Sequence, residues 1–240
     1  MYTFDSRIRY SEIDDQAMLT LTSLINYFQD CSTFQSEDLG VGVGYMAENN
    51  LAWVLASWQI CIDRYPKLCE RVTIGTKPYE LKGFLGQRNF LMYDASGAAI
   101  AKANTIWSLI DISTGKPAMI PDKIKNAYPM EQREEMDYAP RKIAIPAGGV
   151  KAEAVTIERH HIDTNRHVNN QQFIEIAMEA LPERFPVSQL RAEYKKQVFL
   201  HDVITPVVVR TVDGYIVSLE DINGTSVMAA EFKKGTDNNG

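Results

Sequence analysis

Cysteine is scarce in this chain of 240 residues, and its thiols form no recognisable set. Cys31, Cys61 and Cys69 lie far apart, no C-x-x-C occurs, and an odd number cannot pair completely. We therefore expect reduced thiols and no disulfide framework. No apolar run approaches the length of a membrane span, and the first residues, MYTFDSRIRY, lack the apolar stretch of a secretion signal. These absences predict a cytoplasmic protein with no membrane partner.

Several motifs of well-known protein classes are also missing. There is no H-E-x-x-H of zinc proteases and no G-x-S-x-G of α/β-hydrolases. Glycines at 40, 42 and 44 give a G-x-G-x-G string, but it follows a predicted helix instead of opening one, so it indicates a helix stop and not a nucleotide site. The net charge is −6 and no domain is basic, which argues against nucleic acid as the main partner.

The composition permits a sizeable core, because 45% of the residues are hydrophobic and 23% are charged. Residues 2–10 alternate loosely and predict a strand. Apolar residues then recur at three- and four-residue intervals, which predicts one helix face made of Leu21, Leu24, Ile25, Phe28 and Cys31. Thr20 or Thr22 would cap that helix, and Gly40 would end it. β-branched and aromatic residues predict strands at 52–64, 71–80, 84–94 and 98–112.

The second half repeats this order after a proline-rich stretch. Five of the ten prolines fall in 113–150, which indicates a linker with a short helix near 122–135. A strand at 151–160 and a helix at 170–181 follow. Further strands are predicted at 189–199, 203–211, 214–221 and 226–234. Ile13-Asp14 and Ile162-Asp163 hold matching places just before the two helices.

The repeated order predicts duplication of one α+β unit, a long helix laid on a curved antiparallel sheet. We place the N-terminal unit at 1–120, the linker at 121–150 and the C-terminal unit at 151–240. Each unit would expose sheet edges, so two copies would pair edge to edge. The oligomeric state, a homodimer included, is left open by the sequence.

The densest polar stretch, HHIDTNRHVNN at 160–170, lies at the junction before the second helix. A helix N-terminus presents unpaired N–H groups, so an acyl carbonyl there would have its developing negative charge stabilised. Asp163 and His167 could activate water beside it. The amide of Asn165 can donate and accept hydrogen bonds, so it could orient a neighbour or a substrate oxygen.

The same stretch admits blander interpretations. Asp and Asn commonly cap helices, and a polar junction is ordinary surface chemistry. His160, His161, Asp163 and His167 are all metal-ligand types, but neighbouring residues on a strand point to opposite faces. We therefore predict no metal and no cofactor.

DTNRHVNN at 163–170 resembles the catalytic segment of plant and bacterial acyl-ACP thioesterases, whose usual form is D-x-N-x-H-V-N-N. Residues 19–40, 53–66 and 193–196 resemble that family's first-domain helix, its first-domain strand and the strand that brings in a further active-site residue. The resemblance implies a double hotdog that hydrolyses fatty acyl-ACP to fatty acid and holo-ACP. It implies an acyl pocket in the first domain and a catalytic second domain.

The resemblance also assigns roles to the residues. His167 would be general base or acid, Asn165 would orient the reacting group, and Asp163 would hold the helix-end geometry or polarise its neighbours. The family usually has Glu where this chain has Gln197, which can be neither base nor nucleophile but could hold the attacking water. The family also tends to have Trp where we place Ile176, and we expect this difference to alter packing or acyl fit and not the chemistry.

Binding candidates complete the set. Asn169, Trp53 and Phe28 are the substrate-binding candidates, although core packing is the default for large aromatic residues in such segments. A locally basic strip would attract an acidic acyl carrier protein and consists of Arg166, Arg191, Lys195 and Lys196. The alternative is an ordinary solvated strand face.

We favour an acyl-ACP thioesterase, and three rivals stay open. One is a thioesterase for small or aromatic acyl-CoA. A second is a non-catalytic acyl-binding or regulatory hotdog protein, which Gln197 favours. A third is a hotdog dehydratase or hydratase, which also uses a His with a carboxylate. The sequence does not reveal the chain-length preference.

Overall fold

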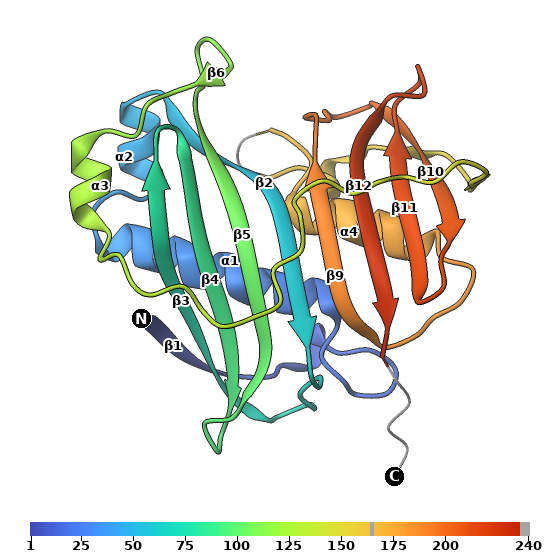
Figure 1. Ribbon diagram of the computed structural model, residues 1–240, viewed down its shortest axis with the longest axis horizontal. Coiled ribbons are helices and arrows are strands. Elements are labelled where there is room, and N and C mark those ends of the chain that lie inside the picture. Colours follow the sequence, from blue (N-terminus) through green and yellow to red (C-terminus); the bar gives the residue numbers. More distant parts are fainter. Residues whose placement is uncertain (164–165, 236–240) are drawn as a thin grey trace. The chain divides into compact units, whose positions relative to one another are not determined.

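The structure is a computed structural model that describes residues 1–163 and 166–235. The chain forms two compact units. The first comprises Met1–Ala56 with Ile62–Tyr138, and the second comprises Ser57–Cys61 with Ala139–Gly240. Each has a long helix and antiparallel strands, so the predicted α+β class is confirmed (Figure 1).

The sheet of the first unit has the strand order β1-β3-β4-β5-β2. Its strands are β1 (Tyr2–Arg7), β2 (Leu51–Ile62), β3 (Arg71–Lys82), β4 (Leu85–Asp94) and β5 (Ala99–Asp111), with the short β6 (Lys116–Pro117) paired to β5. The helices are α1 (Leu21–Asp38), α2 (Val43–Glu48) and α3 (Asp122–Ala127), and a 3-10 turn, η1 (Tyr10–Glu12), precedes α1. The sequence predicted α1 and the four long strands β2 to β5 with ends displaced by only a few residues.

Helix α1 begins and ends where the sequence indicated. The Thr20 hydroxyl accepts a hydrogen bond from the Ser23 N–H at 3.2 Å, which satisfies one of the unpaired donors of the first turn. Gly40 follows the helix with a φ of +68°, a conformation that glycine adopts without strain. The predicted apolar face is buried and includes Leu21, Leu24, Ile25, Phe28 and Cys31.

The second unit has the strand order β9-β12-β11-β10-β7, and the segment Ser57–Cys61 of β2 pairs with β9. Its strands are β7 (Val150–Lys151), β8 (Val155–Thr156), β9 (Val187–Tyr194), β10 (Val203–Arg210), β11 (Gly214–Glu220) and β12 (Ser226–Lys234). Helix α4 (Asn170–Glu179) buries Phe173, Ile174 and Ile176. A second 3-10 turn, η2 (Arg159–His161), precedes it.

Two predicted strands are wrong in part. The strand expected at 151–160 is replaced by β7, β8 and η2, because the Glu158 N–H donates to Nδ1 of His161 at 2.9 Å and closes a turn instead of extending the ladder. The strand expected at 189–199 ends at Tyr194. The N–H groups of Lys195 and Lys196 both donate to the carbonyl of Val227, which breaks the regular pairing.

The compact units divide the chain at a different place from the predicted linker. Ile124 and Tyr128 are buried in a cluster of the first unit that also contains Val41, Met46 and Leu109. Glu134 pairs with Lys77 at 2.7 Å and Lys102 at 3.0 Å. Residues 121–138 therefore fold with the first unit. None of the described helices is long and apolar enough to cross a bilayer.

Candidate active site

A tight loop joins η2 to α4 and carries two of the predicted catalytic residues. Ile162 and Val168 form an isolated antiparallel bridge that closes it. The Asp163 N–H donates to the carbonyl of His167 at 2.8 Å, and the His167 N–H donates to the Asp163 carboxylate at 3.3 Å. Asp163 thus fixes the backbone on both sides of the turn. Asn165, the third predicted catalytic residue, lies outside the described residues.

Asn169 ends the loop and begins α4. Its side-chain oxygen accepts from the Gln171 N–H at 3.0 Å, and its own N–H donates to the His161 carbonyl at 2.8 Å. This substrate-binding candidate is therefore the N-cap of the helix. His167 lies two residues before the cap, close to the positive end of the helix dipole.

His167 is half-buried and is supported by the segment that follows β9. Its ring lies edge-on to Phe199, with ring centres 5.0 Å apart. The Val168 N–H donates to the Val198 carbonyl at 3.0 Å, which ties the loop to that segment. Gln197 is the residue before Val198 and is exposed. The structure thus brings the backbones carrying Asp163, His167 and Gln197 together.

Tyr194 connects β9 to α4, and the sequence analysis noted it only as part of a resembling segment. Its hydroxyl donates to the Asn170 carbonyl at 2.9 Å and so joins β9 to the first turn of α4. Its ring also lies edge-on to Phe173, at 5.9 Å between ring centres. Desolvation of that hydroxyl raises the pKa of Tyr194, which keeps it a neutral donor.

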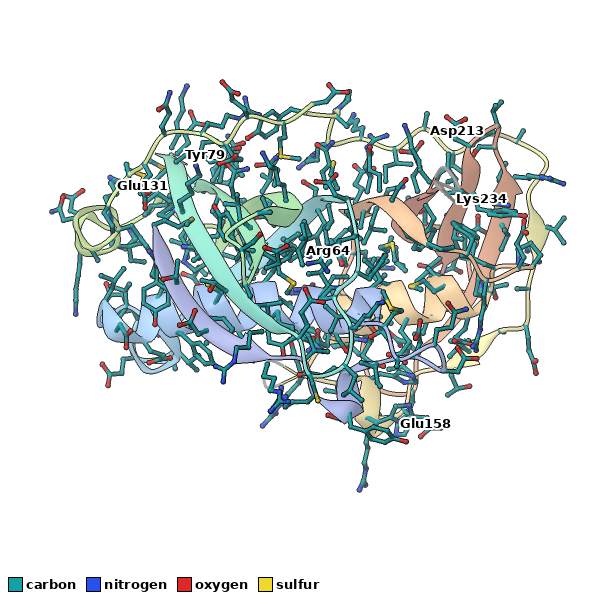
Figure 2. All side chains as sticks on the ribbon, turned by 90° about the horizontal axis from the view of Figure 1, so that it is seen from below. Arg64, Tyr79, Glu131, Glu158, Asp213 and Lys234 are labelled. Atoms are coloured by element: carbon teal, nitrogen blue, oxygen red, sulfur yellow. The ribbon has the colours of Figure 1, made fainter. Side chains whose placement is uncertain are left out.

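The remaining histidines of the polar stretch have structural contacts. His161 is buried and accepts the Glu158 N–H, and Figure 2 labels Glu158 at the surface. Burial lowers the pKa of His161, with the adjacent His160 acting in the same direction. Within the described ranges 1–163 and 166–235, no group of three or more His, Cys, Asp or Glu is arranged to hold a metal ion.

The predicted carrier-binding strip divides into paired and exposed charges. Arg191 on β9 donates to Glu231 at 2.8 Å and to the carbonyls of Pro140 and Lys142, so its charge is engaged inside the unit. Lys196 pairs with Asp221 at 2.9 Å but keeps 59% of its side chain exposed. Lys195 donates to the Ser226 hydroxyl at 3.1 Å.

Arg166, the fourth member of the strip, is exposed on the loop itself, and none of the described residues forms an ion pair with it. Its φ of +65° places it at the apex of the turn. Arg166 and Lys196 each lie two residues before a partner in the Val168–Val198 hydrogen bond. Both residues are therefore close along the chain to the hydrogen bond that joins the loop to the segment after β9.

The aromatic candidates of the first unit lie in its interior. Phe28 is fully buried and packs on Phe90, with ring centres 5.4 Å apart. Trp53 is half-buried and packs against the cluster that contains Tyr128. Both make the core contacts that such residues make by default.

The first unit contains a second copy of the loop. The Asp14 N–H donates to the Met18 carbonyl at 2.8 Å, and the Met18 N–H donates to the Asp14 carboxylate at 2.9 Å. Ile13 and Leu19 form the closing bridge, and Ala17 has a φ of +60° where Arg166 has +65°. Met18 occupies the position that corresponds to His167. The loop conformation is therefore common to both units, whereas the histidine occurs only in the loop of the second unit.

Sequence profiles of a known family cover both units. The profile described as "Acyl-ACP thioesterase N-terminal domain" matches residues 1–128, and the one described as "Acyl-ACP thioesterase C-terminal domain" matches residues 148–233. The chain belongs to the acyl-ACP thioesterase family. The predicted membership is confirmed.

Individual family members are only distantly similar in sequence. The acyl-[acyl-carrier-protein] hydrolase FATB1 of Cuphea viscosissima is 25% identical over 218 residues, which cover 83% of this chain and 52% of that protein. The chain thus spans about half the length of the curated relatives it matches first.

Solved structures of thioesterases share the fold. An acyl-ACP thioesterase from Bacteroides thetaiotaomicron superposes with a TM-score of 0.86 at 22% identity, covering 96% of each chain. The 12:0-ACP thioesterase from Umbellularia californica gives 0.85 at 18% identity, covering 97% of this chain and 96% of that one. The chain is therefore a double hotdog, as the sequence resemblance implied.

Proposed function

We propose that this acyl-ACP thioesterase family member hydrolyses the thioester of fatty acyl-ACP and releases free fatty acid and holo-ACP. The observation that carries the proposal is the position of His167. It lies on a loop fixed by Asp163, two residues before the N-cap of α4. The curated relatives named as acyl-ACP hydrolases support the same reaction.

The proposed reaction needs one base and one site for negative charge. His167 removes a proton from water while the water oxygen attacks the carbonyl carbon of the thioester. The carbonyl oxygen becomes negative near the N-terminus of α4, where the positive end of the helix dipole stabilises it. The carbon–sulfur bond then breaks, and His167 returns the proton to the leaving sulfur.

The other site residues would orient these groups. We assign Asp163 to holding the loop, because its carboxylate accepts the His167 N–H. Asn165 would orient the reacting group, and Gln197 would hold the attacking water through its side-chain amide. Asn169 would contribute to substrate binding as the residue that caps the helix.

The two units would divide the work. We propose that the N-terminal domain, predicted at 1–120, shapes the acyl pocket with Phe28 and Trp53 in its lining, and that the C-terminal domain, at 151–240, carries the chemistry. The exposed charges of Arg166, Lys195 and Lys196 would attract the acidic carrier. Arg191 would support that surface from within through Glu231.

Hydrolysis by the purified protein tests the proposal directly. Acyl-ACP substrates of C8 to C18 should release fatty acid faster than the matched acyl-CoA substrates, and expression in a bacterial host should change its free-fatty-acid profile. A preference for acyl-CoA would show that the substrate is carried by CoA and not by acyl carrier protein. No turnover with either carrier would favour a non-catalytic acyl-binding protein, the second candidate, which Gln197 supports.

Location and assembly stay predictions alongside the activity. A cytoplasmic protein with acyl carrier protein as its macromolecular partner is expected, and cell fractionation would test it. Measuring the solution mass would distinguish a monomer from a homodimer.

A further inference from the structure

Arg88 is a charged side chain in the interior of the first unit. It lies on β4 and is 8% exposed. Its guanidinium carbon is 5.9 Å from the centre of the Phe90 ring and 5.3 Å from the centre of the Tyr128 ring. None of the described residues forms an ion pair with it, and its Nη1 is buried without a hydrogen-bond partner among them. Burial lowers the pKa of Arg88.

A buried acceptor without a partner lies on the helix packed at the same place. Gln35 of α1 is 2% exposed, and its Oε1 has no hydrogen-bond partner among the described residues. The next residue, Ser36, is hydrogen-bonded to the Tyr128 hydroxyl at 2.6 Å. Tyr128 therefore links the turn of α1 that carries Gln35 to the guanidinium of Arg88.

This pair lies among the aromatic residues to which an acyl-lining role was assigned. Phe90, below Arg88, packs on Phe28, and Tyr128 belongs to the cluster against which Trp53 packs. Buried donors and acceptors in folded proteins are nearly always satisfied, and a charged donor is the costliest to leave unpaired. A leucine or methionine at position 88 would avoid the cost of burying a charge.

The two groups together specify what would satisfy them. A guanidinium only donates, and an amide oxygen only accepts. A terminal methyl group satisfies neither, and a ketone satisfies Arg88 alone. A carboxylate would pair with Arg88 but would be repelled by the partial negative charge of the Gln35 oxygen. A hydroxyl group accepts from Arg88 and donates to Gln35 at once.

We propose that the interior of the first unit binds the hydroxyl group of a hydroxylated acyl chain, held between the Arg88 guanidinium and the Gln35 side-chain oxygen. This inference rests on the proposed function and narrows its substrate class. The acyl chain would lie along Phe90 and Tyr128, and the hydroxyl would set which chains fit.

Two measurements on the intact protein test the inference. Calorimetry compares the binding of saturated fatty acids with that of their positional hydroxy isomers, and a kinetic assay compares the matched acyl-ACP substrates. At least one hydroxy isomer should be preferred by on the order of tenfold or more, because a site built to bond a hydroxyl rejects the analogue that lacks it.

Variants separate recognition from folding. Arg88→Met and Gln35→Leu should each remove the preference while the plain chain still binds, whereas Arg71→Met, at an exposed arginine of β3, should preserve it. If Arg88→Met does not fold, Gln35→Leu decides. Equal binding of plain and hydroxylated chains by the unmodified protein would overturn the inference. Absence of all hydrolysis would overturn the proposed function, and the calorimetry would still decide the hydroxyl site.

Discussion

At the scale of single residues, the imidazole of His167 carries both proton transfers of the proposed hydrolysis. Replacing it in His167→Ala should lower kcat/KM by about 10²–10⁴-fold, the usual contribution of a general acid–base group. The fold should persist, because the ring is only half-buried and lies edge-on to Phe199. Steady-state kinetics and circular dichroism measure the two effects.

The matched control is His160→Ala, at an exposed histidine whose ring contacts only the neighbouring His161 among the described residues. It should keep nearly full activity. A near-normal rate for His167→Ala would remove this residue from the mechanism.

Gln197 offers a second test, because the family usually has a glutamate there. Gln197→Glu should fold normally, since the side chain is exposed, and should be as active as the unmodified enzyme or faster. A carboxylate could accept a proton from the attacking water, which the amide cannot do. The pH dependence of kcat should acquire a step near the pKa of the new carboxyl. An inactive variant would count against our placement of Gln197 beside the reacting water.

The sequence predicted the site residues that belong to a motif, but it did not predict a polar residue that is unusual only because it is buried. The DTNRHVNN segment located Asp163 and His167 because their spacing along one loop is visible in the letters. Arg88 was not predicted, since Gln87, Arg88 and Asn89 are consecutive polar residues of one strand. Arg88 and Asn89 are both buried although successive strand residues point to opposite faces, so their burial depends on what packs on each face of the sheet, which is set by tertiary structure.

At the scale of elements, the two copies of the loop allow the role of Asp163 to be tested against Asp14. Each carboxylate accepts the N–H of the residue four positions later. If Asp163 positions His167 through this bond, Asp163→Asn should retain most activity, with a loss below about tenfold, because the amide oxygen still accepts. Asp163→Ala should lose on the order of a hundredfold through misplacement of the loop.

Asp14→Ala is the control for the structural effect of losing the loop hydrogen bond, because the loop of the first unit has no histidine. It should lower the free energy of unfolding by about 0.5–2 kcal/mol, the usual cost of losing such a capping acceptor, and leave kcat nearly unchanged. Denaturant titration and kinetics measure the pair. Equal losses for Asp163→Asn and Asp163→Ala would instead make Asp163 a base.

A buried carboxylate before α1 makes the stability of the first unit depend on pH. Glu12 is 8% exposed and accepts from the Arg9 N–H and the Tyr27 hydroxyl, both at 2.8 Å. Burial alone would raise its pKa, but hydrogen bonds from the Arg9 side chain, the Arg9 N–H and the Tyr27 hydroxyl outweigh burial and hold the pKa of Glu12 below its usual value. Its contribution is complete above about pH 4.3, the ordinary value, and is lost as the pH falls through the lowered one.

Glu12→Gln should therefore unfold more easily than the unmodified protein at pH 7, by roughly 1–2 kcal/mol. The difference should shrink in acid, where the carboxylate is protonated. Thermal melts at pH 7 and at successively lower pH measure it. A difference that stays constant with pH would show that the charge of Glu12 contributes nothing.

Local patterns predicted the elements wherever backbone pairing agreed with residue type. Helix α1 and strands β10 to β12 match the periodicity and turn signals closely. The predicted strand at 151–160 failed because side-chain capping by His161 competes with the ladder. The strand at 189–199 failed because two amides share the carbonyl of Val227, an event decided by a residue distant in sequence.

At the scale of the whole molecule, duplication was visible in the sequence but the extent of each unit was not. The prolines of 113–150 indicated a linker, yet Ile124 and Tyr128 are apolar residues that complete the core of the first unit. Likewise the segment Ser57–Cys61 of β2 belongs with the second unit through its pairing with β9. Both outcomes depend on tertiary packing, that is, on which core or strand each segment contacts. Amino-acid composition does not contain this information.

The proposed function requires exposed basic residues on the surface that attract acyl carrier protein. Acyl carrier protein is acidic, so kcat/KM for acyl-ACP should fall about three- to tenfold between low salt and roughly 0.2 M salt as the attraction is screened. The double variant Arg166→Gln/Lys196→Gln should lose much of this dependence and raise KM with little change in kcat. Both residues are exposed, and each lies two residues before a partner in the Val168–Val198 hydrogen bond.

Lys151→Gln/Arg210→Gln removes the same number of charges from β7 and β10, which β12 and β11 separate from β9. This control should retain the salt dependence of the unmodified enzyme, because its residues lie away from the catalytic loop in the strand order. Hydrolysis of a matched acyl-CoA, measured in parallel, should respond to neither double variant as strongly. If the two double variants changed KM equally, net charge and not the exposed residues of the loop would attract the carrier.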